Sequence, residues 1–399
     1  MTSVIQNRSH IDETLRQAAD AAAVPGVVAV AATDKEIIYE GAFGKRDIAK
    51  PDALTVDSVF WIASMTKAIT CTAALQQVEL GKLSLDEPIG KLLPELSAPQ
   101  ILEGFDASGA AKLRPAKRPI TLRQLMTHTA GFCYDIWNAE MGRYMEQAGI
   151  PGIVSCENKA LTTPLIAEPG EKWDYGINID FVGKAVEAVS GRRLGEYLKD
   201  NIFAPLGMKD TGFKLGEQQR ARLVGMHARG PDGSLAPIPF EVPQEPEFDM
   251  GGGGLYGTGP DYLRFVRALL NGGTLDGNRI LKPETVKTMG QNHIGNLSVT
   301  KLTTAAPPYS NDVDLYPEQD KKWGLSFLIN TQRTAEGRSP GSLAWAGLAN
   351  TYFWLDPTLN VGGVILTQLL PFADGKALEL FGKFESGVYS GLAKARAAA

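Results

Sequence analysis

The pattern of apolar and polar positions predicts strands near both ends of the chain. Apolar residues recur at helical spacing from Ile11 to Ala22, which predicts an opening amphipathic helix. Two apolar runs, 27–32 and 37–43, follow on either side of a polar turn and predict a β-hairpin. Strand character then returns late, in the runs 323–330, 342–349, 351–355 and 361–369, and a helix over 376–397 closes the chain.

Between these ends the chain is predicted to be mainly helical. The clearest helix spans 64–80 and is ended by Gly81. Further helical patterns cover residues 121–129, 179–190, 194–205, 261–271 and 282–289. The Gly- and Pro-rich stretches 104–119, 230–246 and 305–319 are predicted to be long loops. Long loops in a compact protein are often functional, and we expect the stretches 132–165 and 230–256 to line a pocket.

This order of elements predicts an α/β fold with one antiparallel sheet built from both termini and flanked by helices. The length of 399 residues exceeds what one hydrophobic core usually serves, so two lobes are expected. Residues 1–62 and 316–399 would form a discontinuous α/β domain, and residues 63–315 an inserted, mainly helical lobe. An active site is expected at the seam between them.

The composition of the chain indicates which partners and which cellular compartment to expect. The 40 basic and 45 acidic residues form no long run of either sign, so neither nucleic acid nor an anionic membrane is an expected partner. No window reaches eighteen apolar residues, so no membrane span is expected. The three cysteines lack metal-binding spacing and favour free thiols, and no cofactor or metal is expected. The first residues lack the pattern of a secretory signal, so a cytoplasmic location is the expectation.

The sharpest chemical signal is the segment WIASMTK (61–67) at the start of the helix 64–80. Residues three apart share a helix face, so Ser64 and Lys67 can meet. A serine hydroxyl needs a base to become a nucleophile, and burial in an apolar stretch lowers a lysine pKa toward that role. The same letters also fit a helix N-cap with a solvated lysine. A second SxxK, at Ser298 and Lys301, lies in a polar stretch without helical period and is interpreted as chance.

Two further segments carry candidate chemistry. Tyr175 stands in EPGEKWDYGIN (168–178), just before the helix 179–190, where a phenol beside a cation can relay a proton. Taken alone, it fits an aromatic that packs a loop better than a catalytic residue. The strand segment SLAWAGLAN (342–350) carries small residues, which let backbone N–H groups approach a substrate carbonyl, but it also fits an ordinary core strand.

Taken in order, Ser64 with Lys67, Tyr175 after its Pro-Gly lead-in, and the late Trp345-Ala346-Gly347 resemble family VIII carboxylesterases. These are similar in fold to class C β-lactamases, penicillin-binding proteins and DD-peptidases. The segments LMTHTAG (125–131) and GGGGLYGT (251–258) match too, so the resemblance extends from about residue 10 to 370.

The resemblance implies a role for each motif residue. Ser64 is similar to the acylated nucleophile, and Lys67 with Tyr175 resembles its base. The backbone N–H groups of Ser64 and Leu348 would form the oxyanion hole. Trp345, Ala346 and Gly347 would contact the substrate. His128 has no chemical part and is interpreted as a satisfied structural residue.

Two departures from the β-lactamases of this fold change the expected substrate. Where those enzymes carry Lys-Thr-Gly, this chain has Trp345-Ala346-Gly347, and an indole does not replace the lysine charge that holds the β-lactam carboxylate. Ile177 stands where they carry the asparagine of Tyr-x-Asn, unless Asn178 compensates. Both changes favour neutral, apolar acyl groups, and weak β-lactam hydrolysis stays open.

A competing nucleophile motif is rejected. GRSPG (337–341) matches the GxSxG elbow of α/β-hydrolases, but no apolar strand precedes Ser339 and no helix follows it. The triad order would also need a histidine after Ser339, and the last one is His293.

The leading hypothesis is therefore a serine carboxylesterase that hydrolyses small to medium uncharged esters through an acyl-Ser64 enzyme. Three alternatives remain: an acyltransferase to an alcohol acceptor, a β-lactamase or DD-peptidase, and a binding module without catalysis. The expected partner is a small-molecule ester, and the sequence predicts no oligomeric state.

Overall fold

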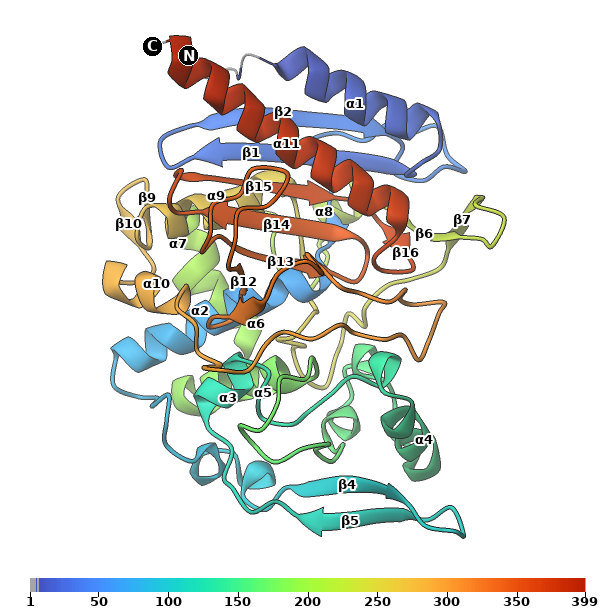
Figure 1. The fold of residues 1–399 in the computed structure, drawn as a ribbon, viewed down its shortest axis with the longest axis vertical. Coiled ribbons are helices and arrows are strands. Elements are labelled where there is room, and N and C mark those ends of the chain that lie inside the picture. The colour runs from blue at the N-terminus through green and yellow to red at the C-terminus, as the bar shows by residue number, and fades with distance from the viewer. Residues whose placement is uncertain (1–4, 6, 399) are drawn as a thin grey trace.

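A seven-stranded antiparallel sheet forms the body of the protein (Figure 1). The computed structural model describes residue 5 and residues 7–398, with the backbone alone for 395–398. The sheet order is β11-β12-β13-β14-β15-β1-β2. Its strands are β1 (Gly26–Thr33), β2 (Ile37–Gly44), β11 (Lys321–Trp323), β12 (Leu328–Asn330), β13 (Leu343–Gly347), β14 (Thr351–Asp356) and β15 (Val361–Leu366). Because β1 pairs with β15 from Val28↔Leu366 to Thr33↔Val361, both termini build one sheet, as predicted.

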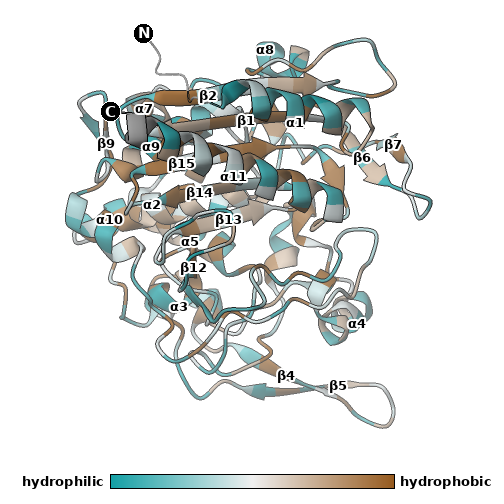
Figure 2. Cartoon of the chain, turned by 45° about the horizontal axis from the view of Figure 1, so that its top comes forward, coloured by the Kyte–Doolittle hydropathy of each residue, from teal (hydrophilic) through white to brown (hydrophobic). Residues whose placement is uncertain are grey.

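Helices cover both faces of this sheet. The N-terminal helix α1 (Arg8–Asp20) and the C-terminal helix α11 (Gly375–Ala398) lie side by side over one face (Figure 1). Aromatic contacts join α11 to the sheet, with Trp354 within 5.7 Å of Phe384 between ring centroids. Helix α9 (Gly259–Leu270) packs against β1 and β15. In Figure 2 the strands of the sheet are largely hydrophobic, while α1 and α11 carry many hydrophilic residues.

Helix α2 (Thr66–Glu79) runs through the centre of the molecule and follows a 3₁₀ turn at Ala63–Met65. Nearly all of its side chains are buried, since it packs on α5 (Asn178–Ser190) and α6 (Leu194–Leu198) as well as on the 3₁₀ turn. The other helices are α3 (Leu122–Met126), α4 (Ala139–Ala148), α7 (Ala204–Leu206), α8 (Glu217–Ala221) and α10 (Pro283–Met289), with a π-helical turn at Lys199–Phe203 between α6 and α7.

Several local predictions were wrong. The stretch 104–119 is no structureless loop, because β4 (Gln100–Phe105) and β5 (Ala111–Pro115) form a hairpin there. The stretch 323–330 is not one strand: β11 ends at Trp323, and the left-handed residue Ser326 (φ +81°) turns the chain back into β12. The stretch 132–165 contains α4, and 230–246 contains β7 (Leu235–Ile238), which pairs with β6 (Met226–Arg229).

The small strands fix the remaining connections. β3 (Phe60–Trp61) pairs with β8 (Tyr256–Gly257), which brings the start of α2 beside the glycine segment 251–254. β16 (Leu369–Leu370) pairs with β6, and β9 (Thr274–Leu275) pairs with β10 (Asn278–Arg279). The division into 1–62 with 316–399 and 63–315 stays a prediction, although α9, from the middle segment, packs on the sheet.

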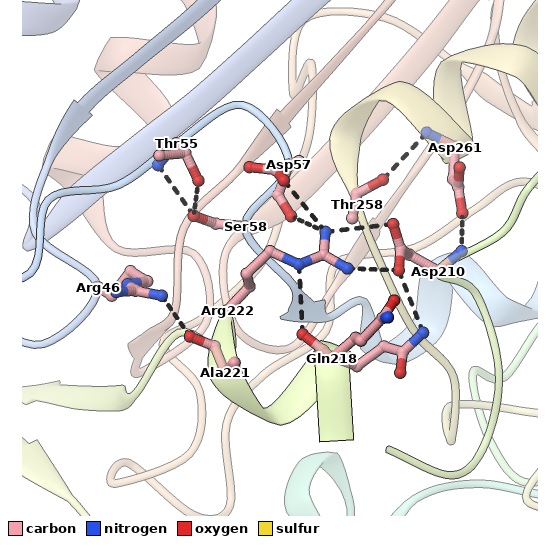
Figure 3. Close-up of polar contacts among 11 residues, drawn as sticks. Arg46, Thr55, Asp57, Ser58, Asp210, Gln218, Ala221, Arg222, Thr258 and Asp261 are labelled. Atoms are coloured by element: carbon pink, nitrogen blue, oxygen red, sulfur yellow. Dashed lines mark hydrogen bonds and ion pairs between the residues drawn. The ribbon is translucent and has the colours of Figure 1, made fainter. Parts of the chain in front are cut away.

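A polar cluster around Arg222 ties α8 to the start of α9 (Figure 3). The Arg222 guanidinium donates to the carboxylate of Asp210 at 2.6 Å and to the carbonyl of Asp57 at 2.7 Å. The Asp210 backbone N–H in turn donates to Asp261, the first-turn carboxylate of α9, at 2.8 Å. Thr258 caps the same helix by accepting from the Asp261 N–H. Through Asp210, these contacts with carboxylates link the end of α8 to the first turn of α9.

Within the described residues, no helix has the length and apolar character needed to span a bilayer. In the same part of the chain, His, Cys, Asp and Glu side chains do not gather in groups of three that would hold a metal ion.

Candidate active site

Ser64 lies in the 3₁₀ turn that opens α2, directly after a strained residue. Ala63 has φ +45°, a left-handed conformation that is uncommon for residues other than glycine and that often marks functional sites. The Ile62 N–H donates to the Leu255 carbonyl at 3.0 Å, and the Leu255 N–H donates to the Thr66 hydroxyl at 3.2 Å. These bonds fix the turn against the glycine segment 251–254.

Lys67 is completely buried and reaches back to Ser64. Its Nζ lies 3.0 Å from Ser64 Oγ, 2.9 Å from the Tyr134 hydroxyl and 2.6 Å from the Gly252 carbonyl oxygen. The structure thus brings the predicted nucleophile and base within hydrogen-bond distance, and excludes the alternative of a solvated lysine.

Tyr175 is also present but contacts Lys67 differently from the expectation. Its ring centroid lies 4.8 Å from Lys67 Nζ, a cation–π contact. Its hydroxyl accepts a hydrogen bond from the indole N–H of Trp345 at 2.9 Å. In the described residues, the phenol that hydrogen-bonds to Lys67 belongs to Tyr134, which the sequence analysis missed.

The two tyrosines are held side by side by their backbones. The Tyr134 N–H donates to the Tyr175 carbonyl at 3.1 Å, and the ring centroids lie 5.2 Å apart. Gly176 permits this approach, because a Cβ there would lie 2.5 Å from Cys133 Cα. The phenol pair is therefore a product of two loops that cross closely.

Strand β13 forms the opposite wall. At Gly347 a Cβ would lie 2.4 Å from the Ile62 carbonyl oxygen and 2.2 Å from Thr351 Oγ1, so only glycine lets β13 approach the turn before Ser64. A small cavity lies between these walls. It is lined by Ser64, Trp137, Tyr175, Trp345, Ala346, Gly347, Leu348 and Phe372, with no charged side chain among them.

All five residues predicted for substrate and oxyanion contacts line this cavity. Ser64 and Leu348, assigned to the oxyanion hole, share this cavity with Trp345, Ala346 and Gly347. The predicted pocket loop 132–165 contributes Trp137, whose ring centroid lies 5.5 Å from that of Tyr175. The loop 230–256 places the Gly252 carbonyl against Lys67, but none of its residues lines this cavity.

His128 and Asn178 hydrogen-bond to each other and do not line the cavity. The Asn178 amide lies 3.0 Å from His128 Nδ1 and donates to the Phe132 carbonyl at 3.3 Å, so it does not replace the missing asparagine of Tyr-x-Asn. His128 is completely buried, and its Nε2 has no hydrogen-bond partner among the described residues. The expectation of a fully satisfied histidine therefore holds for one ring nitrogen only.

Burial sets the protonation of the groups around Lys67. Burial raises the pKa of the Tyr134 phenol well above its usual range, and nearby Asp180 adds to this. Burial, with the charge of Lys67, lowers the pKa of His128. Burial also raises the pKa of Asp180 to about 6, against the opposing charge of Lys67. At neutral pH the phenol of Tyr134 and the imidazole of His128 are therefore uncharged.

The rejected motifs lie elsewhere. Ser339 is buried between β12 and β13, where its N–H donates to Asp356 at 2.9 Å, and it does not line the cavity. Lys301 of the second SxxK forms an exposed ion pair with Asp312 at 2.7 Å.

Comparisons with known proteins find relatives that match nearly the whole chain. The chain is 31% identical over 400 residues to a monacolin J acid methylbutanoyltransferase of Aspergillus terreus, covering 95% of each chain. It is 33% identical over 402 residues to a lovastatin esterase of Penicillium rubens, covering 95% of this chain and 98% of the relative.

Among solved structures, unliganded simvastatin synthase from Aspergillus terreus superposes with a TM-score of 0.84 at 30% identity, over 96% of this chain and 98% of that one. A family VIII carboxylesterase shares the fold at 17% identity, with a TM-score of 0.67 over 96% and 99% of the chains. A model of the family described as beta-lactamase matches residues 11–382. The chain therefore belongs to the beta-lactamase family and has the serine β-lactamase-like fold shared by penicillin-binding protein homologues and family VIII carboxylesterases.

Proposed function

We propose that this protein is a serine acyltransferase that takes an acyl group from an uncharged ester, holds it on Ser64, and passes it to an alcohol. The observation that carries the proposal is the 3.0 Å contact between Lys67 Nζ and Ser64 Oγ beside a cavity without charged side chains. The expected partners are therefore small molecules, an acyl ester and an acceptor alcohol.

In the first step, the neutral amine of Lys67 takes the Ser64 proton while Oγ attacks the ester carbonyl. The proton then passes to the departing alkoxide, so the amine returns to its starting state. Tyr134 and Tyr175 flank Lys67 and provide the route along which this proton moves. The Tyr175 hydroxyl oxygen already accepts from Trp345, so its own O–H proton remains for the substrate side.

The negative charge on the carbonyl oxygen needs donors in the same cavity. The backbone N–H groups of Ser64 and Leu348 are the proposed pair, because both residues line the cavity and β13 lies close against the turn before Ser64. Such fixed donors stabilise a developing oxyanion more than water does. In the second step an acceptor alcohol loses its proton to Lys67 and attacks the acyl carbonyl. The bond between the acyl carbon and Ser64 Oγ then breaks, and Lys67 returns the proton to Ser64 Oγ.

The lining favours an apolar acyl group. Trp137, Trp345, Leu348 and Phe372 supply apolar contact surface, and none of the side chains that line the cavity is a cation that could bind a carboxylate. This supports the expectation of neutral acyl groups and opposes a primary β-lactamase or peptidase role.

We prefer transfer to an alcohol over hydrolysis because several relatives are acyltransferases. The sequence favours an esterase first, but proteins described as acyltransferases match the chain at 31–36% identity. The apolar, aromatic lining of the cavity also favours an apolar alcohol over water as the acceptor. Hydrolysis is the second candidate, favoured by the 33% identity to the lovastatin esterase.

The test supplies p-nitrophenyl esters of increasing chain length with and without a competing alcohol, and separates free acid from new ester by mass spectrometry. We expect an acyl adduct on Ser64 and mostly new ester when alcohol is present. Exclusive release of free acid at every alcohol concentration would leave hydrolysis as the function.

Two serine variants locate the nucleophile. Ser64→Ala removes the attacking oxygen, so acyl turnover should fall at least about a thousandfold. Ser339→Ala is the matched control, since Ser339 lies outside the cavity, and it should keep near wild-type turnover. The reverse pattern would overturn the assignment.

We also propose that the protein is located in the cytoplasm. Its three cysteines are buried free thiols, which supports a reducing compartment.

A further inference from the structure

A carboxylate behind Lys67 has no role in the chemistry so far. Asp180 lies in the first turn of α5, is 1% exposed, and is flanked along the chain by Ile179 and Phe181. Its Oδ1 accepts from the Gly252 N–H at 2.8 Å. Its Oδ2 is buried without a hydrogen-bond partner among the described residues. Burying a carboxylate in this way costs stability unless another group uses its charge.

Gly252 connects this carboxylate to the base. The Gly252 N–H points to Asp180, while the Gly252 carbonyl accepts from Lys67 Nζ at 2.6 Å. The neighbouring Gly251 carbonyl is anchored by the Thr70 hydroxyl at 2.8 Å. One residue of a fixed loop therefore bridges the amine and the carboxylate.

The bridge requires a glycine. A Cβ at position 252 would lie 2.6 Å from Asp180 Oδ2 and 3.0 Å from its Cγ and Oδ1. The glycine segment 251–254 thus lets the carboxyl group lie directly against the backbone that holds Lys67. An alanine there would push the carboxylate away.

We infer that Asp180 is a positioning residue whose negative charge, acting through Gly252, stabilises the ammonium that forms on Lys67 when Ser64 loses its proton. The inference rests on the proposed roles of Ser64 and Lys67. The proton moves from Ser64 Oγ to Lys67 Nζ and later to the leaving alkoxide, and Asp180 neither gains nor loses one. The carboxylate acts on the charged form of the base and touches no substrate.

A structural role for Asp180 is the competing explanation. A carboxylate in the first turn of a helix also interacts favourably with the helix dipole. Asparagine would keep the hydrogen bond from the Gly252 N–H and remove only the charge. The Asp180→Asn variant therefore separates the two roles, because a structural cap has no influence on how the reactivity of Ser64 depends on pH.

The other titratable groups near the pair do not replace this charge. They are Cys71 on α2, His128 and Tyr134 in the loop after α3, Asp135 next to Tyr134, Cys156, Tyr175 before α5, and Asp249. Burial raises the pKa of Cys71 and of Cys156 to about 12, and it lowers that of His128. Burial and the charge of Asp180 raise the pKa of Tyr134 and of Cys156, with smaller additions from Asp135 on Tyr134 and from Asp249 on Cys156.

The experiment measures the rate at which a fluorophosphonate probe labels Ser64 in the full chain between pH 5 and 10. In the wild type the rate should rise with pH, which gives the profile a rising limb. Without the Asp180 charge the ammonium is less stable, so in Asp180→Asn the rising limb should move to lower pH by about one unit. The plateau should be about tenfold lower or more, because the base is weaker.

Glu187→Gln is the matched control. Glu187 is a half-buried carboxylate two turns further along α5 that accepts from the Leu194 N–H at 2.8 Å, away from Lys67. Glu187→Gln should leave the rising limb of the labelling profile at the same pH as in the wild type. Gly252→Ala, which displaces the carboxylate, should move the limb in the same direction as Asp180→Asn and serves if that variant does not fold.

The outcomes separate the two proposals. An unlabelled wild type would overturn the function proposed for Ser64. A labelled wild type whose limb stays fixed in folded Asp180→Asn, or in Gly252→Ala, would overturn the role of Asp180 alone.

Discussion

At the scale of single residues, Lys67 has two phenols beside it that are not equivalent. Tyr134 offers its hydroxyl oxygen to the amine, whereas Tyr175 offers its ring face and points its hydroxyl toward Trp345. If Tyr175 carries the proton on the substrate side, Tyr175→Phe should lower kcat by about 10²–10⁴-fold. Tyr134→Phe should cost about tenfold, since Lys67 keeps two other partners.

Steady-state kinetics of the two single variants and the double variant check this ranking. Because both phenols act on one amine, the losses in the double variant should be less than additive. A larger loss in Tyr134→Phe than in Tyr175→Phe would assign the proton to Tyr134 instead.

The sequence predicts only those site residues that lie within one helical turn of each other or in a recognised motif. Ser64 and Lys67 are three residues apart on one helix, so their contact follows from local geometry. Tyr134 contacts Lys67 across 67 positions and follows no motif that the sequence analysis used. Asp180 had a signal, a single carboxylate among the apolar residues that open α5, but such a residue usually only complements the helix dipole.

At the scale of elements, the site depends on how closely β13 approaches the turn before α2. Gly347→Ala would place a Cβ 2.4 Å from the Ile62 carbonyl oxygen and 2.2 Å from Thr351 Oγ1. The strand must then move away from Ser64, so we expect labelling of Ser64 to slow at least tenfold and the unfolding temperature to fall. Fluorophosphonate labelling and thermal unfolding measure the two effects.

Gly142→Ala is the control for this prediction. Gly142 lies within α4, and an added Cβ would meet no atom within 4 Å. The same chemical change should there stabilise the protein by about 0.5–1 kcal/mol, because alanine favours the helix. Equal behaviour of the two variants would show that the approach of β13 has no special role.

The prediction of strands succeeded where the strand is buried and failed where it is exposed. Strands β1 and β15 are almost wholly buried, so their apolar runs identify them. The hairpin β4–β5 is largely exposed along β5, so residues 111–115 carry no apolar pattern. The break between β11 and β12 depends on the left-handed conformation of Ser326, which the surrounding apolar run conceals.

At the scale of the whole molecule, buried histidines make stability depend on pH. Burial lowers the pKa of His128, His227 and His293 below the usual value. A group with a depressed folded pKa stabilises the protein above its unfolded pKa, near 6.5, and this contribution is lost as the pH falls through the folded value. Asp180 has the opposite sign: its contribution is present below pH 3.8 and is lost as the pH rises through about 6.

Between pH 7.5 and 6 the histidines should therefore dominate, and the unfolding temperature should be lower at pH 6. His227 is completely buried, and its Nε2 accepts from the Ile48 N–H at 3.2 Å, a bond that requires the neutral ring. In His227→Gln an amide oxygen can accept the same bond at either pH, so the difference between the two temperatures should shrink. In the control His10→Gln, at an exposed position on α1, it should stay as in the wild type. Scanning calorimetry of the three proteins at both pH values decides the matter, since an unchanged difference in His227→Gln would exclude that histidine as a source of the acid sensitivity.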